Sequence, residues 1–518
     1  MFSKRLLGVF LAGSLLEGCV EFSSSKKADN GDSQGALQAD PEEDLQKATN
    51  EEKKEASQGD DNNPLKSPPV SSIPKALPQC RPYDETKQGK IASFKGAEGF
   101  GRHSKGGRGG DVYHVTNLKD KDPGSLRHGI ESAKGPRTIV FEVSGTIHLE
   151  KPLYIRNSRL TLAGQTAPGG GITLRNRALV VKASDIVIRY LRTRLGDLDR
   201  EASEDDALTI AAGNDIMIDH VSASWGIDEV LSNQSDTADR ITVQWSIISE
   251  ALHASIHPKG SHGMGGIVGS ASQSFHHNLY AHNPSRNPKV TWRRHCKVDF
   301  RNNVVYNWKN NTSYDGENSH MNWVNNYYKP GPATRSKVLS RIFEIGDEDN
   351  DSSKKLGVSA SLYAHGNFIK NNAKVSENNW DGGIDFAGDK SEQKNRAMTP
   401  FPYPPITEQS AEQAYADVLS YAGASHKRDS LDERIISEVK EGKAIYGNNG
   451  IINSQKEVQG WPVLESKPAP EDKDRDGMAD EWEVKVGLDP TKKDHNCIQL
   501  SEKGYTNLEV YLDQLVAR

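Results

Sequence analysis

Short extended runs recur along the middle of this chain, and their spacing constrains the fold more than any other feature. From about Thr138 onward such runs start about every two dozen residues, for example at 186–191, 216–220 and 241–245. Their apolar and polar side chains alternate, as half-buried strands require. The spacing is too long for hairpins, and no helical segments lie between the runs as in a βαβ fold. We therefore expect an all-β fold, a right-handed parallel β-helix with peripheral loops and a small helical C-terminal tail.

Asparagine residues follow several of these runs at similar offsets. Asparagine tolerates a left-handed backbone and bonds to nearby amides at tight bends. In stacked coils these side chains would align into a ladder, although turn asparagines can also be unrelated to one another. The residues concerned are Asn278, Asn302, Asn303, Asn325, Asn326 and Asn367.

The N-terminus has the pattern of an export signal. Lys4 and Arg5 precede a short apolar core at 6–16, and the following residues, LEGC, resemble a lipobox that would make Cys19 a lipidated residue. Glu17 fits that pattern poorly, so an ordinary secretory signal is the alternative. We expect an exported protein, a bacterial cell-surface or outer-membrane lipoprotein or otherwise a secreted one, whose only membrane contact is a lipid anchor.

Composition divides the remaining chain. Residues 20–79 are polar and charged, which predicts a disordered linker. Residues 80–465 carry the β-helix pattern, and 466–518 form the tail.

The formal net charge of −6 offers no global basic surface for nucleic acid. We expect a monomer. Beyond Cys19 the cysteines are Cys80, Cys296 and Cys497; one bridge is possible, but the sequence does not say which.

Three segments outside the repeats have helical patterns. Residues 124–130 predict a capped helix over the open first coil. Residues 409–421 and 431–439 have helical spacing of apolar residues and are expected to pack outside the β-helix.

The C-terminal tail contains an acidic pattern that fits a twelve-residue EF-hand loop at 472–483, with Gly477 at the turn. A solvated acidic run is the alternative. We expect a calcium ion with a structural role. The predicted ligands occupy loop positions one, three, five, nine and twelve: Asp472, Asp474, Asp476, Asp480 and Glu483.

Four motifs occur in an order that resembles polysaccharide lyase family 1, the pectate lyases. They are DALTI at 206–210, DEVLSN at 228–233, HPKGSHG at 257–263 and SRNPKV at 285–290. The resemblance covers roughly residues 96–462. It implies cleavage of pectate, an acidic polysaccharide, by calcium-dependent β-elimination, with an arginine that takes the proton.

Elimination on a uronate polymer needs acidic ligands for a cation, a base, and positive charge beside the developing anion. Calcium suits this reaction because it is a hard ion that accepts many oxygen ligands. The resemblance implies that Asp206, Glu229 and Asn233 hold the ion, with Asp228 as an alternative ligand. Asn233 departs from the acidic residue of the family. Because adjacent strand residues point to opposite faces, Asp228 and Glu229 are not expected to share one ion without a bulge.

Arg286 matches the arginine that serves as Brønsted base in the family, and Lys259 matches the lysine that steadies the substrate carboxylate. A guanidinium has a reference pKa above about 12, so nearby cations and desolvation would have to lower it. Electrostatic stabilisation of the carbanion is the alternative role. Thr291 replaces the second arginine of the family pattern. The expected substrate contacts are Lys289, Arg293 and Arg294.

Three other functions fit parts of the pattern. A pectin lyase acting on methyl-esterified chains would need little calcium, and Asp206 and Glu229 argue against it. A glycoside hydrolase would need aspartates flanking the scissile bond, and no such set is evident. A β-helix that binds polysaccharide without cutting it remains compatible with the fold.

Overall fold

The structure is a computed structural model that describes residues 79–517, apart from 88, 199–200, 291–294 and 347–359. All described residues belong to one compact unit, Ile73–Arg518. The predicted signal peptide with Cys19, and the predicted linker except its last residue, lie outside the described residues. No helix within the described part of the chain is long and apolar enough to cross a membrane.

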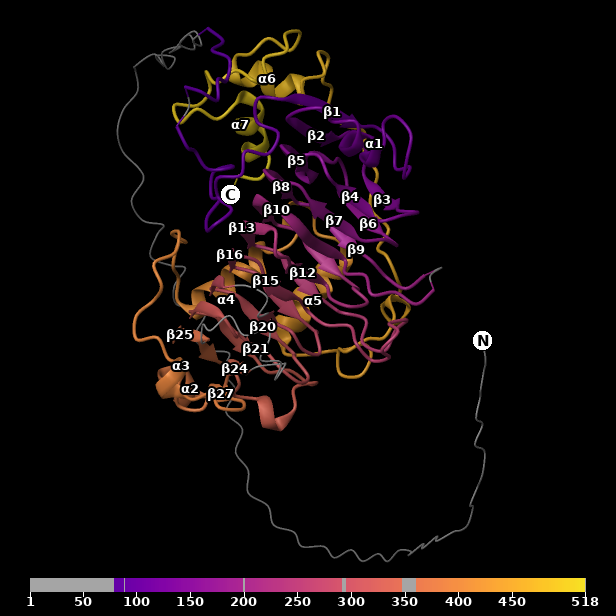
Figure 1. Ribbon diagram of the computed structural model, residues 1–518. Helices are drawn as coiled ribbons and strands as arrows, with labels where there is room; N and C mark the ends of the chain where they lie inside the picture. The colour runs from indigo at the N-terminus through magenta and orange to yellow at the C-terminus, as the bar shows by residue number, and fades with distance from the viewer. Residues whose placement is uncertain (1–78, 88, 199–200, 291–294, 347–359, 518) are drawn as a thin grey trace, which may run out of the picture. The chain divides into compact units, whose positions relative to one another are not determined.

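Parallel strands wind around a common interior in a 9-stranded and an 18-stranded sheet, to which successive coils contribute (Figure 1). The larger sheet has two parts that are joined through β10, called sheet 1 and sheet 3 here, and the smaller one is called sheet 2. Sheet 1 contains β1 (Asp111–Val115), β2 (Arg137–Phe141), β5 (Leu160–Ala163), β8 (Ile186–Arg189), β10 (Leu208–Asp219), β13 (Ala238–Gln244), β16 (Ser272–His276), β19 (Cys296–Arg301), β22 (Ser319–Val324) and β25 (Ser361–His365). Sheet 2 contains β3 (Gly145–His148), β6 (Ile172–Arg175), β9 (Arg192–Arg194), β11 (Ser222–Ser224), β14 (Ile247–Ser249), β17 (Leu279–Ala281), β20 (Val304–Tyr306), β23 (Tyr327–Lys329) and β26 (Phe368–Ile369). Sheet 3 contains β4 (Leu153–Ile155), β7 (Leu179–Lys182), the first part of β10, β12 (Leu231–Gln234), β15 (Ile267–Gly269), β18 (Lys289–Val290), β21 (Ser313–Asp315), β24 (Phe343–Ile345) and β27 (Ile384–Phe386). The predicted parallel β-helix is confirmed.

The register of sheet 1 stacks apolar side chains coil upon coil. Each of the following residues pairs with the next: Ile139, Leu162, Ile188, Ile218, Val243, Phe275, Phe300 and Trp323. All of them are buried, and the rings of Phe300 and Trp323 are stacked with centroids 4.4 Å apart. The period-2 alternation of each run therefore fills a continuous core, and this removal of apolar surface from water is the main stabilising contribution.

An asparagine ladder lines the turn between sheets 1 and 2, as predicted. The side-chain oxygen of each member accepts hydrogen bonds from the backbone and side-chain amides of the member before it, at 2.8–3.1 Å. Asn302 and Asn325, which precede two of the members, have left-handed φ values of 55° and 52°. The ladder thereby satisfies buried turn amides that have no sheet partner. Its members are Asn278, Asn303, Asn326, Asn367 and Asn379, of which the sequence did not indicate the last.

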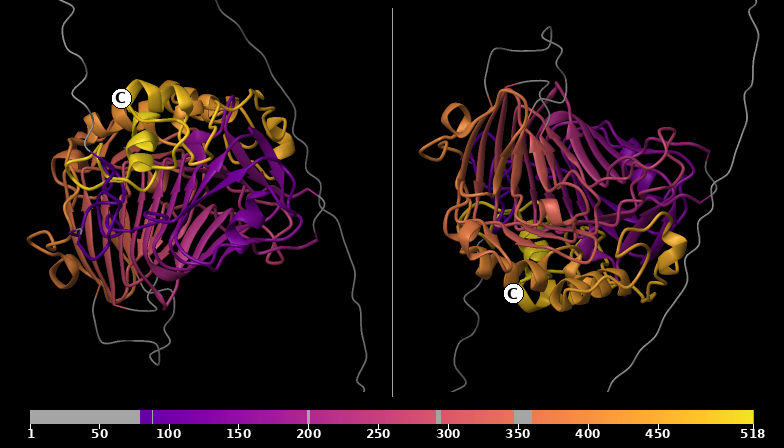
Figure 2. Two further views of the ribbon diagram at one scale, coloured as in Figure 1. Left: turned by 90° about the horizontal axis from the view of Figure 1, so that it is seen from above. Right: turned by 90° about the horizontal axis from the view of Figure 1, so that it is seen from below.

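The predicted helices form and pack outside the coils. α1 (Leu126–Glu131) begins after the N-cap Ser125 and contacts β1, β2 and β4 of the first coils. α4 (Ala411–Tyr421) and α5 (Ser430–Glu441) share an apolar cluster with Ile247, Leu279 and Val304 of sheet 2. Both views of Figure 2 show the helices along one flank of the coils.

A buried ion network fastens α5 to sheet 2. The fully buried guanidinium of Arg194 donates to both oxygens of Asp429, at 2.8 and 2.9 Å, and to Asp432 at 2.9 Å. Asp429 also caps α5 by accepting from the backbone of Asp432. Ser224 accepts from the second terminal nitrogen of Arg194, at 2.7 Å. Arg194 thus binds two buried carboxylates at the start of α5, and Arg192, also on β9, adds a second positive charge 3.5 Å from Asp429.

Asp299 is a buried carboxylate on β19, and its environment predicts a pH-dependent stability. Its Oδ1 accepts from the Nε of Arg301 at 2.9 Å, while its Oδ2 is buried without a hydrogen-bond partner. Burial, opposed by Arg301, raises the pKa of Asp299 to about 6. A raised carboxyl pKa means that the folded state binds the proton more tightly than the unfolded state. The contribution of Asp299 to the free energy of unfolding is therefore fully present below the pKa of the unfolded state, and it is lost as the pH rises through about 6. At about 1.4 kcal/mol per pKa unit, this loss amounts to about 3 kcal/mol.

We expect Asp299→Asn to remove this dependence. The free energy of unfolding of the variant minus that of the wild type should be about 3 kcal/mol larger at pH 7.5 than at pH 4. Urea unfolding of both proteins at several pH values measures the difference and cancels the titration of all other groups. If the difference in unfolding free energy between wild type and variant does not change with pH, the explanation by a buried carboxylate is contradicted.

Candidate active site

The register of sheet 3 brings three of the predicted site residues to one edge on successive coils. Leu208 pairs with Leu231, so Asp206 and Glu229, each two residues earlier, lie side by side. Glu229 forms a parallel bridge with Met264. Ile267 pairs with Lys289, which places Arg286 beside Met264 on the next coil. Residues 80 positions apart in the chain thereby converge at the turn that leads into sheet 3.

Three carboxylates meet at this edge. Oxygen atoms of Asp206, Asp228 and Glu229 all lie within 4.8 Å of one another. Strand alternation was expected to keep Asp228 and Glu229 from sharing one ion without a bulge, and the backbone here is irregular, because both residues lie in the turn before β12. Gly226 makes this turn possible, since a Cβ there would lie 1.8 Å from the backbone oxygen of Glu229.

The surroundings shift the pKa values of Asp206 and Asp228 in opposite directions. Asp206 is buried, and it accepts from Thr209 Oγ1 at 2.9 Å and from the backbone amide of Glu229 at 3.0 Å. Burial and then the neighbouring charge of Asp228 raise the pKa of Asp206 to about 8. Burial also acts to raise the pKa of Asp228, but the hydrogen bond from His262 and the charges of His262 and Arg286 outweigh it and hold that pKa below its ordinary value. The cluster is therefore a crowded set of oxygen donors.

Arg286 faces the carboxylate cluster. Its Nη1 forms an ion pair with Glu229 Oε1 and lies 3.8 Å from Asp228 Oδ1. The side chain is 13% exposed and has a left-handed backbone with φ of 56°. Gly265 lies directly beneath it, because a Cβ there would be 2.5 Å from the backbone oxygen of Arg286. Among the described residues, the charged groups that Arg286 contacts are thus acids, and Arg293 and Arg294, two of the cations expected near it, lie outside this part of the chain.

The glycine-rich segment with Lys259 adds two histidines that the sequence did not indicate as site residues, and Glu204, from an earlier loop, lies beside them. His262 Nε2 lies 2.6 Å from Asp228 Oδ1, and the ring of His257 stacks on it with centroids 4.1 Å apart. His257 Nδ1 accepts from the amide of Lys259, so its proton is on Nε2, 3.7 Å from Asp228. That tautomer leaves no lone pair on Nε2 for a metal. His257 and His262 flank the predicted site residue Lys259 within one glycine-rich motif, and this position was the signal in the sequence that could have identified them.

Lys259 itself lies at the exposed rim of this group. Its side chain is 66% exposed, and its Nζ is 3.4 Å from Glu204 Oε1. The same glutamate oxygen is 3.8 Å from His257 Nε2. A chain of contacts therefore links Lys259 through Glu204 and His257 to Asp228 and Arg286.

Asn233 does not join the cluster, which corrects the predicted ligand set. It follows Leu231 by two residues on β12 and therefore points to the same interior face. Its Nδ2 donates to Gln273 at 2.7 Å, and its Oδ1 accepts from the amide of Gly269 at 3.2 Å. The side-chain amide is buried and serves the packing of sheet 3.

The predicted substrate contacts are placed in part. Lys289 is buried on β18, and its Nζ lies 3.5 Å from Asp315 Oδ2. Thr291, Arg293 and Arg294 lie outside the described residues. The cation that the sequence placed closest to Arg286 thus interacts with an acid of the next coil.

Comparisons with known proteins identify the family of the chain. No protein-family model matches the chain. The chain is 35% identical over 442 residues to a probable pectate lyase C of Aspergillus terreus, covering 82% of this chain and 94% of that protein. It is 36% identical over 465 residues to a probable pectate lyase C of Emericella nidulans, covering 86% and 97%.

Among solved structures, the chain is similar to jun a 1, the major allergen from cedar pollen, with 18% identity and a TM-score of 0.47, over 63% of this chain and 92% of that one. The family assignment rests on the two fungal relatives, each of which matches along nearly its whole length. The chain therefore belongs to the pectate lyase family, and the protein is a polysaccharide lyase.

Proposed function

We propose that this pectate lyase cleaves (1→4)-α-D-galacturonan, the homogalacturonan of pectate, by calcium-dependent β-elimination to unsaturated oligogalacturonides. The observation that carries the proposal is the convergence of Asp206, Asp228, Glu229 and Arg286 at one edge of sheet 3. Acidic ligands and a guanidinium at the same place are the parts that elimination from a sugar acid requires.

The donor set fits calcium. Three carboxylates supply only oxygen atoms, and burial together with the charge of Asp228 raises the pKa of Asp206, which a bound cation would oppose. Asp206, Asp228 and Glu229 would hold the ion. When bound, calcium withdraws charge from the uronate carboxylate and so stabilises the anion that forms beside it.

The protein side chains supply the proton transfer and the orientation. In the elimination the C5–H bond and the C4–O bond of the uronate break, a C4=C5 double bond forms, and the leaving oxygen takes up a proton. Arg286 is the group that we assign to the C5 proton, as acceptor or as electrostatic partner of the developing charge. Lys259, at the exposed rim, is suited to hold the sugar carboxylate, while His257 and His262 hold Asp228 in place.

The same site weighs against the two nearest alternatives. A pectin lyase binds neutral methyl esters, for which three carboxylates at the site provide no favourable partner. A protein that only binds polysaccharide would have no use for an arginine held against acids at the edge of successive coils. Both alternatives make predictions that the assay below separates.

The disulfide between Cys80 and Cys497 supports export. Its Cα atoms are 5.3 Å apart and 417 residues separate the two cysteines, while the buried Cys296 is not part of this disulfide. Structural disulfides persist in oxidising compartments. We infer that the protein is exported, and lipidation at Cys19 is the proposed means of surface attachment.

The direct test is ultraviolet absorbance during incubation with polygalacturonate. We expect the absorbance of the unsaturated uronate to rise with calcium and to stop rising when a chelator is added. Glu229→Gln should raise the calcium concentration for half-maximal activity at least about tenfold, since it removes one charged ligand of the site. Highly methyl-esterified pectin serves as the comparison substrate.

Each alternative has its own signature in this assay. Faster, calcium-independent cleavage of the methyl-esterified substrate would identify a pectin lyase. New reducing ends without the absorbance would show hydrolysis, and binding without either product would leave a non-catalytic role. Any of the three results would overturn the proposal.

A further inference from the structure

The acidic loop at 472–483 is closed by hydrogen bonds to its own backbone and continues into α6 (Asp480–Val486). Asp472 accepts from the amides of Asp476 and Gly477, at 3.1 and 2.9 Å. Oxygen atoms of Asp472, Asp474 and Asp476 lie within 4.8 Å of one another. The first three predicted ligands of the loop are thus brought together.

The fourth predicted ligand is not part of this group. Both oxygens of Asp480 bind Lys473: Oδ1 accepts from its amide at 2.9 Å, and Oδ2 is 2.6 Å from its Nζ. Asp480 begins α6 and points back to the start of the loop. The position-nine assignment made from the sequence is therefore corrected.

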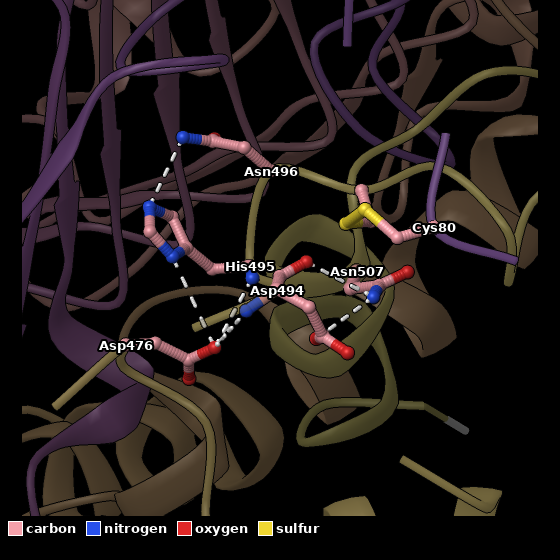
Figure 3. The surroundings of a disulfide bond; sticks show 7 residues. Cys80, Asp476, Asp494, His495, Asn496 and Asn507 are labelled. Atoms are coloured by element: carbon pink, nitrogen blue, oxygen red, sulfur yellow. Dashed lines mark hydrogen bonds and ion pairs between the residues drawn. A yellow bond between two sulfur atoms is a disulfide. The ribbon is translucent and has the colours of Figure 1, made fainter. Parts of the chain in front are cut away.

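A residue from beyond the loop takes that place. Asp494 lies eleven residues after Glu483, yet its oxygens and those of Glu483 and Asp476 lie within 4.8 Å of one another. Asp476 Oδ2 accepts from the amides of Asp494 and His495, both at 3.1 Å, which positions this segment against the loop (Figure 3). Asp476 belongs to both groups and joins them into one cluster of five carboxylates.

One member of the cluster shows independently that a cation belongs there. Glu483 is fully buried, and neither of its carboxylate oxygens has a hydrogen-bond partner. A buried carboxylate with no donor is costly unless a cation neutralises it. Asp474, in the group with Asp472 and Asp476, likewise has two buried oxygens without a hydrogen-bond partner among the described residues. Burial, and then the neighbouring acids, raise the pKa of Glu483 to about 8 and that of Asp476 to about 7.

The segment that carries Asp494 also connects the two ends of the described chain. Asn507, at the start of α7 (Asn507–Gln514), donates to Asp494 Oδ1 at 3.0 Å. Three residues after Asp494, Cys497 forms the disulfide with Cys80 (Figure 3). Asn496 donates to the backbone oxygen of Gly110, just before the edge strand β1, at 2.8 Å.

The tail covers the first coils as well. Met478, Leu508 and Leu512 pack in one apolar cluster with Ala163 of β5 and Val112 of β1, and α6 and α7 lie beside β1 and β2 in Figure 1. β1 pairs with β2 on one side only, so its other edge needs protection from unwanted strand pairing. The acidic cluster thus lies at the place where the tail is attached to the amino-terminal end of the coils.

We propose that a calcium ion bound by Asp472, Asp474, Asp476, Glu483 and Asp494 fastens the C-terminal tail over the first coils, and that the ion and the Cys80–Cys497 disulfide secure the same segment. Calcium is the cation of choice because every donor is oxygen and their number exceeds what magnesium usually takes from protein. Asp494 is the ligand that ties the loop to the disulfide-bonded segment. This site is separate from the carboxylates beside Arg286, and its role is stability and not catalysis.

The experiment uses the whole exported chain and a matched pair of substitutions. Asp494→Asn removes a proposed ligand, and Asp480→Asn makes the same chemical change at the motif position that the structure excludes. Terbium luminescence excited through Trp482, the neighbour of Glu483, reports binding, and the thermal midpoint with and without calcium reports stabilisation. We expect Asp494→Asn to weaken terbium binding at least about tenfold and to lose most of the calcium-induced rise in midpoint, while Asp480→Asn behaves as the wild type.

Activity separates this inference from the proposed function. At moderate temperature and saturating calcium, Asp494→Asn should cleave polygalacturonate at the wild-type rate, whereas Glu229→Gln should keep the terbium signal of the C-terminal site and need a higher calcium concentration for half-maximal activity. Equal effects of Asp494→Asn and Asp480→Asn, or the absence of any calcium-induced stabilisation in the wild type, would overturn the proposal. Circular dichroism of each variant shows that it is folded before binding is measured.

Discussion

Arg286→Lys should lower kcat on polygalacturonate by about a thousandfold while the protein stays folded. A positioned proton-transfer group contributes about 10²–10⁴ to the rate. Lysine keeps the positive charge beside Glu229 but replaces a planar, forked donor with a point charge on a different stem. The Arg286 guanidinium lies against Glu229 and 3.8 Å from Asp228, so a shift of its charged end alters its aim at the substrate.

The measurement is the initial rate of absorbance increase at saturating calcium, with the thermal midpoint as a check of folding. Arg156→Lys is the matched control, because Arg156 is an exposed arginine between β4 and β5 and contacts none of the site carboxylates among the described residues. It should leave the rate unchanged. An Arg286→Lys enzyme with more than a tenth of wild-type activity would contradict the assignment of the proton to this residue. The pH–rate profiles of the two enzymes separate a base from an electrostatic role, since only loss of a base removes a titration from the profile.

Arg194→Met should destabilise the protein by about 3–5 kcal/mol, which is the usual cost of breaking a buried ion network on one side. The substitution keeps the apolar volume but removes the cation that binds both Asp429 and Asp432, while Arg192 remains with its Nε 3.5 Å from Asp429. Arg194 itself binds Asp429 through three short contacts. Two uncompensated carboxylates at the start of α5 would loosen the contact of this helix with sheet 2.

Chemical denaturation of the variant and of Arg156→Met measures the effect, and the exposed control should change stability by less than about 1 kcal/mol. Adding Asp429→Asn to Arg194→Met should recover part of the loss, because the second change removes one stranded charge. A double variant that is as unstable as the sum of the single variants would show that the charges are not coupled.

Much of the fold could be predicted because its signals are local. Strand alternation, the spacing of the runs and the turn asparagines each depend on a few neighbouring residues, and the confirmed β-helix and the ladder at Asn278 and Asn303 follow from them. The order of the site motifs likewise pointed to Asp206, Glu229 and Arg286 before their geometry was known. The helices α4 and α5 were predicted from apolar periodicity, which is also local.

Side-chain direction at the sites could not be predicted in this way. Asp228 lies in a turn whose shape depends on the coil above it, and Asn233 points inward because β12 continues the alternation of Leu231. Whether Asp480 or Asp494 completes the C-terminal cluster depends on how two loops meet, eleven residues apart in sequence. The choice of Cys80 as the partner of Cys497 depends on contacts across 417 residues.

The sequence by itself determined the repeating coils, the family and the identity of the reacting groups, because each is encoded within a few residues or in the order of motifs. Tertiary structure alone decided which carboxylates share a site, which histidines hold them, and how the tail is attached to the first coil. Those properties depend on the register between coils, and no stretch of chain contains the information on where its neighbours on other coils will lie.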